Sequence, residues 1–367
     1  MNDSELLALH RELVAIPSPS GHESAAADYV TRQLATHRLD PFRVGDNVCA
    51  LIGVRGPLLY LNSHLDTVPA TPEWTRPPHT PTREGERVYG LGSNDAKAAV
   101  AAMIAAMTRL RALECRVLLT LVVGEETGGK GTEVLLPALV ERGLTPDAVI
   151  VGEPTGLDVA VAQKGLLILE LVEQGRACHA AHASRLGATN ALRLLARDLI
   201  ALDGVDLGPP HPELGPVTLE PTMADGGSAK NVVPAAARCV LDVRTNPEPD
   251  HDAIIERLRA ATAGELRVIS KRLLPCAVTP THPLVGAALT ARPEARLFGS
   301  RGASDWIFFA GIPGIKVGPG ESERSHTPDE FVLEKEILAG AAFYQRTVQT
   351  FAARAREAMP MHDRSIA

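Results

Sequence analysis

The chain of 367 residues has no closely spaced cysteine pairs, no clusters of basic residues and no long apolar run. Its five cysteines are odd in number, lie far apart and include no Cys-x-x-Cys pair, which favours reduced thiols in the cytoplasm over a disulfide framework. The longest apolar run, Ala98 to Met107, is too short to span a bilayer. The first residues also lack the basic start and apolar core of an export signal. We therefore expect a cytoplasmic protein that does not bind membranes.

The charge and length of the chain narrow the possible partners and the number of domains. The formal net charge is −7, whereas nucleic acids and anionic membranes bind clustered Lys and Arg. No nucleic-acid or membrane partner is therefore expected, and a small-molecule substrate is the simpler hypothesis. At 367 residues, the chain exceeds the usual size of one domain, so two domains are expected.

The first part of the chain alternates between patterns typical of helices and of strands. Apolar spacing predicts two helices within Ser4 to Leu39, broken at the Pro- and Gly-containing segment 17–21. The next elements predicted are strands at Leu58–Asn62, Val117–Val123 and Ala148–Val151, and a helix at Ala96–Leu113. This alternation predicts an α/β domain with a mostly parallel sheet and helices on both faces.

From about Leu166 the pattern changes to one typical of a small α+β domain. The predicted elements are strands at Leu166–Val172 and Arg238–Val243 and helices at Asn190–Leu202 and Ala253–Ala261. A four-stranded sheet with two helices on one face fits this order. His326 lies far beyond this region and must join the earlier residues if it contributes to their site. We therefore predict a domain of residues 166–280 inserted into a domain of residues 1–165 and 281–367.

Imidazole and carboxylate side chains follow the predicted strands or lie in Gly- and Pro-rich loops. In open parallel sheets, ligands bind beyond the carboxyl ends of the strands, and His64, Glu125, Glu126 and Glu153 should emerge there. The candidate metal ligands are His64, Asp95, Glu125 or Glu126, Glu153 and His326. A donor set without cysteine suits a catalytic metal better than a structural one. Each residue alone is more often a solvated loop residue, so the prediction depends on their joint occurrence.

The same residues suggest a division of labour. The carboxylates of Asp95, Glu126 and Glu153, with one hydroxide, balance two divalent cations, and Asp95 is the natural bridging ligand. Asp66 lies two residues after His64 and can accept its second ring N–H. Adjacent glutamates both reach one site only if the backbone bends, which Gly124 permits. With Glu126 as a ligand, Glu125 is free to act as general base and then general acid.

Five segments together resemble the signature blocks of the zinc-dependent aminoacylase and carboxypeptidase family, peptidase family M20. The segments are 63–69 (SHLDTVP), 90–97 (GLGSNDAK), 124–126 (GEE), 151–155 (VGEPT) and 324–330 (RSHTPDE). This family includes acetylornithine deacetylase, succinyl-diaminopimelate desuccinylase and glutamate carboxypeptidases. The resemblance runs nearly from end to end of the chain.

The resemblance assigns a role to each residue of the metal site. It implies two Zn²⁺, with Co²⁺ as a possible substitute, one held by His64, Asp95 and Glu153 and the other by Asp95, Glu126 and His326. It implies Glu125 as the general base and acid and Asp66 as the partner of His64. It also implies a cis peptide bond between Asp95 and Ala96.

The resemblance further implies that the inserted domain is a lid and dimerisation domain. His179, in the segment 175–181, resembles the histidine that reaches the active site of the partner subunit and stabilises the oxyanion, which implies a homodimer. Without the resemblance, His179 would be read as a surface or lid histidine. The residues that it assigns to substrate binding are Asn231, Arg244, Lys164, Gly302 and Ala303. Asn231 and Arg244 would hold the α-carboxylate, although a structural ion pair is the alternative for Arg244. Ala303 replaces the threonine that is usual in the substrate loop.

Within the family, the segments 89–95, 162–166 and 318–326 look most like acetylornithine deacetylase. The expected reaction is hydrolysis of N2-acetylornithine, succinylornithine or acetylcitrulline to the amino acid and a carboxylate in arginine biosynthesis. One alternative keeps the chemistry and changes the substrate, as in a desuccinylase, an acyl-lysine hydrolase or a dipeptidase. Another is a zinc-binding relative that has lost catalysis, although every residue that the mechanism needs is present.

Overall fold

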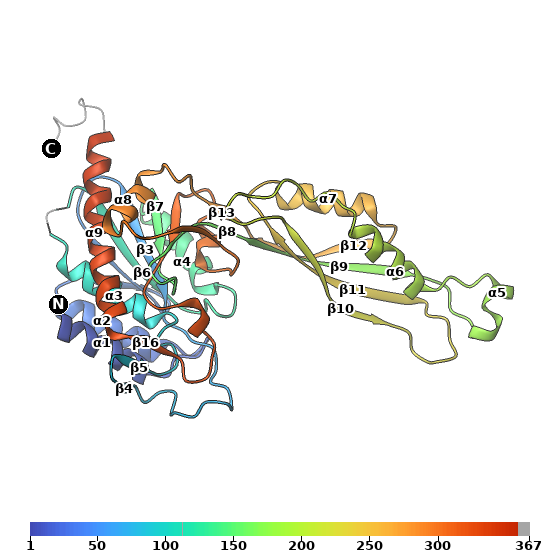
Figure 1. Cartoon of the computed structure of the whole chain (residues 1–367), viewed down its shortest axis with the longest axis horizontal. Helices are drawn as coiled ribbons and strands as arrows, with labels where there is room; N and C mark the ends of the chain where they lie inside the picture. Colours follow the sequence, from blue (N-terminus) through green and yellow to red (C-terminus); the bar gives the residue numbers. More distant parts are fainter. Residues whose placement is uncertain (112, 359–367) are drawn as a thin grey trace. The chain divides into compact units, whose positions relative to one another are not determined.

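The computed structural model describes residues 1–111 and 113–358, which form two compact units (Figure 1). The described residues of the first unit lie within Met1–Val161, Ala277–Phe298 and Ser304–Ala358. The second unit comprises Ala162–Cys276 and Gly299–Ala303. Residue 112, in the predicted helix Ala96–Leu113, and residues 359–367, in the predicted catalytic domain, lie outside the described residues.

The first unit is built on a mixed sheet with a parallel centre. Its strands are β1 (Pro41–Val44), β2 (Asn47–Ile52), β3 (Leu58–His64), β6 (Arg116–Val122), β7 (Ala148–Val151), β8 (Val159–Gln163), β13 (Cys276–Ala277), β14 (Leu297–Ser300) and β15 (Gly314–Lys316). Among the described residues the order is β1-β2-β6-β3-β7-β15-β8-β13, and β14 pairs with β8. β3 is parallel to β6 and β7, and β15 is parallel to β7. The predicted α/β class is therefore confirmed.

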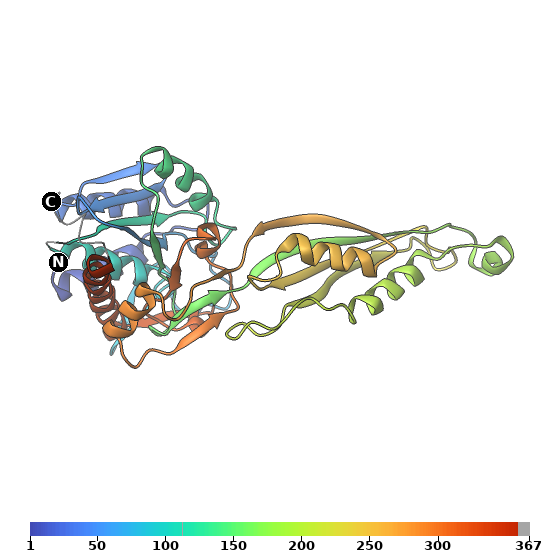
Figure 2. The ribbon, with the colours of Figure 1, turned by 90° about the horizontal axis from the view of Figure 1, so that it is seen from above.

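Helices cover both faces of this sheet, because successive side chains along its strands point to opposite faces and both faces are apolar. The helices are α1 (Asp3–Ala15), α2 (Ser24–Thr36), α3 (Lys97–Arg109), α4 (Lys130–Glu141), α8 (Pro283–Ala291), α9 (Glu334–Ala358) and the 3-10 helix η2 (Asp305–Phe309). Leu59 and Leu61 of β3 belong to the core that includes α1, α2, α3, α8 and α9. Tyr60 between them meets Phe309 of η2, with 6.0 Å between ring centroids. α4 contacts η2 as well (Figure 2).

A small sheet in the first unit holds the loops that approach the site. Its strands are β4 (Thr82–Glu84), β5 (Arg87–Tyr89) and β16 (Phe331–Leu333), in the order β16-β5-β4. The side chain of Phe331 lies between two guanidinium groups, with Arg87 and Arg324 each 4.6 Å from its ring centroid. These cation–π contacts fix the strand that follows His326.

The second unit is a four-stranded antiparallel sheet with two helices on one face. Its strands are β9 (Gly165–Gln174), β10 (Thr218–Gly226), β11 (Ala236–Thr245) and β12 (Glu265–Leu273), in the order β10-β11-β9-β12. Leu167, Leu169 and Leu171 alternate along β9 and pack against α6 (Ala191–Leu202) and α7 (His251–Ala261). This confirms the predicted α+β composition. The short helices η1 (Ala180–His182) and α5 (Ala183–Leu186) follow β9.

Among residues 1–111 and 113–358, none of the helices combines the length and the apolar character that a membrane crossing needs.

Candidate metal centre

The predicted metal ligands come from separate segments of the first unit. His64 is the last residue of β3, Glu126 lies in the turn after β6, and Glu153 follows β7 by two residues. Asp95 lies in the loop before α3. His326 lies in the loop between the 3-10 helix η3 (Ser322–Arg324) and β16. Because β3, β6 and β7 are parallel, three of these five residues reach the same edge of the sheet.

Asp95 stands between two imidazole–carboxylate groups. Its Oδ1 lies 3.3 Å from His64 Nε2, and its Oδ2 lies 3.8 Å from His326 Nε2. Glu153 Oε1 is 4.0 Å from His64 Nε2, and Glu126 Oε1 is 2.9 Å from His326 Nε2. One oxygen of Asp95 therefore faces each group, as a bridging carboxylate requires. The grouping is the one that the family resemblance implies.

The electrostatics of this cluster suit divalent cations. Burial and the carboxylate of Asp95 raise the pKa of Glu153 to about 8. Burial lowers the pKa of His64, but hydrogen bonds to Asp66 and Asp95 and the charge of Glu153 outweigh it and raise that pKa well above its usual range. The hydrogen bond to Glu126 raises the pKa of His326 to about 9. The converging carboxylates therefore favour protonation of their neighbours where a cation would otherwise balance the charge. His64, Asp95 and Glu126 offer metal-ligand atoms that lie within 4.8 Å of one another.

The interaction between His64 and Asp66 differs in one detail from the prediction. Nδ1 of His64 lies 3.0 Å from the backbone carbonyl of Asp66 and 3.5 Å from its Oδ1. The carbonyl is thus the nearer acceptor for the Nδ1–H, which leaves Nε2, on the side of Asp95, as the nitrogen that could bind a metal. The carboxylate of Asp66 instead accepts the backbone N–H groups of Glu125 and Glu126, both at 3.1 Å. One residue therefore orients both His64 and the turn that carries the glutamates.

The turn after β6 contains the bend that two adjacent glutamates need in order to reach the same site. β6 ends at Val122, and Gly124 has a φ of 69°, a conformation that favours glycine. The chain leaves the strand here, so the predicted bend is present. Burial raises the pKa of Glu125 well above its usual range, and the charge of Glu153 adds to this effect despite the opposing influence of His64. A carboxylate with a raised pKa is suited to accept and return a proton near neutral pH.

Glu330 also supports this centre, although no role was predicted for it. Its buried carboxylate accepts the backbone N–H groups of Gly92 at 3.0 Å, Asn94 at 2.7 Å and Asp95 at 2.9 Å. The peptide bond between Asp95 and Ala96 is cis, as the resemblance implies. Glu330 lies in the segment 324–330 that carries the resemblance, but its type alone did not indicate a partner.

The loop of Asp95 is also tied to the loop that leads to His326. The side chain of Asn94 accepts the N–H of Glu321 at 3.0 Å, and its amide donates to the carbonyl of Glu321 at 3.0 Å. This pair of bonds fixes the residue before Asp95 against the segment that carries the second imidazole.

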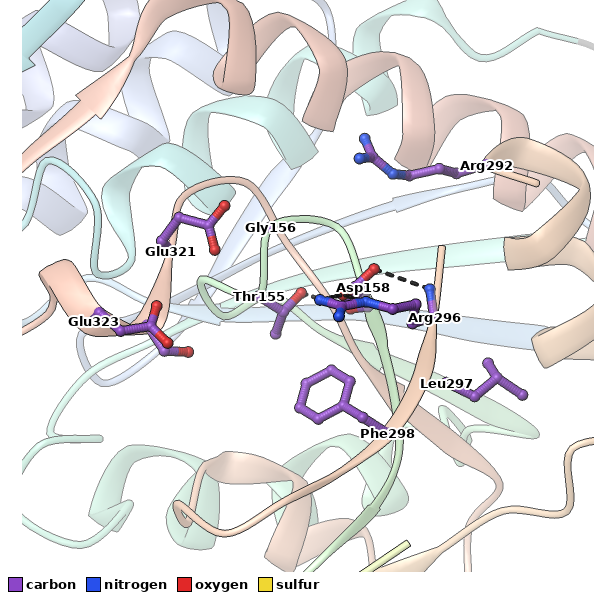
Figure 3. Close-up of a pocket in the computed structure, with 10 residues that line it drawn as sticks. Thr155, Gly156, Asp158, Arg292, Arg296, Leu297, Phe298, Glu321 and Glu323 are labelled. Carbon is purple, nitrogen blue, oxygen red and sulfur yellow. Dashed lines mark hydrogen bonds and ion pairs between the residues drawn. The ribbon is translucent and has the colours of Figure 1, made fainter. Parts of the chain in front are cut away.

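A cavity of about 580 Å³ with several charged residues in its lining lies beside these loops in the first unit (Figure 3). Its walls come from residues 155–158 after Glu153, residues 321–323 before His326, and residues 292–298. Glu321 and Glu323 lie on one side and Arg292 and Arg296 on the other, and Arg296 forms an ion pair with Asp158 at 2.6 Å. Ser322 donates to the carbonyl of Pro154 at 2.6 Å and so joins two of the walls. The charged lining suits polar ligands.

The predicted catalytic and substrate-binding residues of the second unit form two groups. At one end of the sheet, His179 and Asn231 lie on paired segments, because the N–H of Ala180 donates to the carbonyl of Asn231 at 2.8 Å. Both side chains are exposed, and His179 Nδ1 accepts the N–H of Ala181 at 3.2 Å.

At the other end of the sheet lie Arg244, Lys164 and the segment with Gly302 and Ala303. The N–H of Lys164 donates to the carbonyl of Ser300 at 3.0 Å, and its Nζ donates to the carbonyl of Pro216. Arg244 is held by Asp242 through bonds of 2.8 Å and 3.0 Å, so the ion pair considered as the alternative is present. Its Nε and Nη2 are therefore engaged within β11.

This arrangement separates two residues that the resemblance assigns to one task. The strand β9 pairs with β11 over residues 165–174, so the two ends of the sheet are separated by about 30 Å at 3.3 Å per residue. Asn231 and Arg244 of one chain therefore cannot hold the same carboxylate. Their joint use would therefore require two chains. The sequence does not show this separation, because residue type and sequence order do not reveal at which end of a sheet a side chain lies.

The chain matches the sequence model of Peptidase family M20/M25/M40 over residues 60–350. It belongs to this family. A succinyl-diaminopimelate desuccinylase of Rhizorhabdus wittichii is 30% identical over 372 residues, covering 94% of this chain and 97% of the relative. An N-acetyl-L-citrulline deacetylase of Xanthomonas campestris pv. campestris is 30% identical over 344 residues, covering 88% and 90%.

Solved structures share the fold, and one of the following two is described as a member of family M20. Aminopeptidase PepT of Bacillus cereus superposes with a TM-score of 0.80 at 19% identity, covering 96% of this chain and 99% of that one. The YXEP protein of Bacillus subtilis, described as a dinuclear metal binding peptidase, superposes with a TM-score of 0.73 at 18% identity, covering 94% and 97%. The predicted family is thus confirmed, and the chain is an M20 hydrolase of the metal-dependent peptidase and deacylase type.

Proposed function

We propose that the protein is a two-metal amidohydrolase that removes the acyl group from an N-acyl amino acid. The observation that carries this proposal is the placement of Asp95 between two groups, one of His64 and Glu153 and the other of His326 and Glu126. Each group with Asp95 would hold one Zn²⁺, with Co²⁺ as a possible substitute. When bound, the two ions supply positive charge that polarises the amide carbonyl and favours ionisation of water.

In this proposal, the protein's own residues position the reactants and move the proton. Glu125 accepts a proton from the attacking water and returns it to the nitrogen of the leaving amine, so that an amine and a carboxylate are formed. Asp66 keeps the ring of His64 and the Glu125–Glu126 turn in place. Arg244, Lys164, Gly302 and Ala303 lie together at one end of the second unit and are the proposed contacts for the substrate.

The proposed substrate is N2-acetylornithine, with succinylornithine and acetylcitrulline as close relatives. Three segments of the chain resemble acetylornithine deacetylase, and a relative at 30% identity is named for the deacetylation of N-acetyl-L-citrulline. The corresponding role would be in arginine biosynthesis in the cytoplasm. The equal identity of a succinyl-diaminopimelate desuccinylase supports desuccinylation as the second candidate.

A homodimer formed through the second unit is also proposed. Leu192, Ala196 and Ile200 repeat every fourth residue on one face of α6, and all three are exposed, Ile200 by 73%. Beside this face, β10 is one of the two edge strands of the sheet, and Met223 on it is 70% exposed. An apolar helix face next to an open strand edge suits a second copy of the same sheet and helix. His179 and Asn231 would then act in the active site of the partner subunit.

A substrate panel tests the proposed function. The protein, reconstituted with zinc or cobalt, is assayed for amine release from acetylornithine, succinylornithine, acetylcitrulline, acetyllysine, succinyl-diaminopimelate and simple dipeptides. The highest kcat/KM is expected for acetylornithine. A clear preference for succinyl-diaminopimelate would establish the second candidate, and cleavage of dipeptides alone would overturn the proposal.

A further inference from the structure

The segment between α1 and α2 contacts the turns of the metal centre, although the family match begins only at residue 60. Ser18 is fully buried, and its hydroxyl donates to the carbonyl of Leu65 at 2.8 Å. The carbonyl of Ser18 accepts the N–H of Thr67 at 2.9 Å. Ser20 donates its hydroxyl to Oδ2 of Asp66 at 2.7 Å. These bonds fasten the loop that follows His64 to the N-terminal segment.

Glu23 extends the same segment to the turn that carries the glutamates. Its side chain is buried, and its Oε1 accepts the N–H of Gly124 at 3.0 Å and that of Gly21 at 2.9 Å. Asp66 accepts the next two N–H groups, those of Glu125 and Glu126. Three consecutive N–H groups therefore end on two carboxylates that come from different parts of the chain.

This pattern fixes the direction in which Glu125 projects. A peptide plane whose N–H is bound at a defined point cannot rotate without breaking that bond, and here the planes before residues 124, 125 and 126 are all held. Asp66 secures the two planes nearest the glutamate side chains, and Glu23 secures the plane where the chain leaves β6 at the left-handed Gly124. Small displacements of a reacting group lower turnover steeply, by about 10²-fold for 1 Å.

We propose that Glu23 is a positioning residue for Glu125. Its carboxylate holds the Gly124 N–H and thereby keeps the proton-transferring carboxylate at its working distance from the substrate, without touching the substrate itself. The inference rests on the proposed role of Glu125 as general base. It predicts a loss of turnover that is independent of metal content and of substrate affinity.

A matched control exists in the same pair of helices. Glu12 of α1 accepts the hydroxyl of Tyr29 of α2 at 2.6 Å, so it also bonds to α2 but does not contact the turn at 124–126. Glu12→Ala therefore removes a carboxylate contact to this helix without removing an acceptor for Gly124. A general effect of weakening the N-terminal helices and the segment between them would appear in both variants.

The experiment compares Glu23→Ala, Glu23→Gln, Glu12→Ala and Glu125→Gln by kcat, KM, metal content and melting temperature, on the best substrate of the panel. Glu23→Ala is expected to lower kcat about 10- to 100-fold, with KM within about twofold and the metal content unchanged. Glu23→Gln is expected to recover most of the kcat, because its side-chain carbonyl can accept the same two N–H groups. If Glu23→Ala does not fold, Glu23→Asp, whose shorter side chain cannot span the same distance, replaces it under the same criteria.

Two outcomes overturn the inference, and a third removes its basis. Glu23→Ala with the kcat of Glu12→Ala would show that the bond to Gly124 does not matter for turnover. Glu23→Gln as inactive as Glu23→Ala would show that the hydrogen bonds are not the cause. If Glu125→Gln were active, the proposed base itself would be wrong, whereas an inactive Glu125→Gln beside an active Glu23→Ala would reject the positioning role alone.

Discussion

The carboxylate of Glu330 accepts the backbone N–H of Asp95 at 2.9 Å, so a buried acid holds the residue that lies between the two halves of the centre. The same carboxylate accepts the N–H groups of Gly92 and Asn94. Glu330 precedes β16, and two guanidinium groups make cation–π contacts with the ring of Phe331 in that strand. The bridging position of Asp95 therefore depends on a residue from the far end of the chain.

Glu330→Ala should weaken metal binding. The substitution leaves three buried N–H groups without their acceptor, at a cost of about 1–3 kcal/mol for each unsatisfied group, so the loop of Asp95 should relax. We expect the bound metal to fall below two ions per chain after dialysis against a weak chelator, measured by elemental analysis. Asp329→Ala, whose carboxylate bonds to Thr75 and Arg76 instead, serves as the control. Equal metal retention in both variants would contradict the assigned role.

Glu125→Gln should separate metal binding from turnover. The amide has the shape of the carboxylate but cannot accept the proton of the attacking water, so kcat should fall by about 10²–10⁴-fold. Metal content should stay unchanged, because Glu126 and not Glu125 is the proposed ligand. The neutral comparison is Glu141→Gln at the exposed end of α4. An active Glu125→Gln would refute the assigned base.

Removing the metal ions should lower stability as well as activity. Asp95, Glu126 and Glu153 converge on two imidazoles, so chelation should increase the repulsion between the carboxylates. A ligand that binds only the folded state at 100 times its Kd adds about 2.7 kcal/mol. The melting temperature should therefore fall after chelation and rise again with Zn²⁺ or Co²⁺. Asp95→Ala should lose most of this rise. If chelation left the melting temperature of the wild type unchanged, a resident metal would be excluded.

The parts of the site that could be predicted from sequence are those next to strong local patterns. β3, β6 and β7 are contiguous apolar runs, so their carboxyl ends could be located, and with them His64, Glu125, Glu126 and Glu153. β10 could not be predicted in this way, because almost all of its residues are exposed and no apolar alternation marks it. Backbone pairing with β11 forms this strand, and that pairing depends on residues distant in sequence.

The supporting residues were missed for a related reason. Glu23 and Glu330 act through backbone N–H groups at Gly124 and Asp95, far away along the chain. A backbone N–H is common to all residues except proline, so no residue type on the receiving side marks the contact. Only the folded structure reveals which carboxylate meets which turn. The same limit applies to Asn231 and Arg244, whose types suit one task but whose positions lie at opposite ends of a sheet.

Mixing two inactive variants should test whether His179 works in the partner subunit. His179→Ala should lower turnover with its metal content unchanged, because His179 belongs to the second unit and the proposed ligands belong to the first. In a dimer of His179→Ala with Glu125→Gln, one site would combine an intact Glu125 with an intact His179 from the other chain. Random pairing in an equal mixture makes half of the dimers mixed, each with one intact site of two, so about one quarter of wild-type activity should return.

The control for this mixture is His179→Ala combined with the double variant His179→Ala/Glu125→Gln. No pairing of these chains contains an intact His179, so their mixture should stay at the level of His179→Ala whichever chain supplies the histidine. Activity is measured after the subunits have been exchanged and the mixed dimer has been isolated with two different affinity tags. Activity in the isolated mixed dimer no higher than in the parent variants would mean that His179 serves its own chain. The separation of about 30 Å between the two ends of the sheet would then have to be reconciled with a site that uses Arg244 and His179 of one chain.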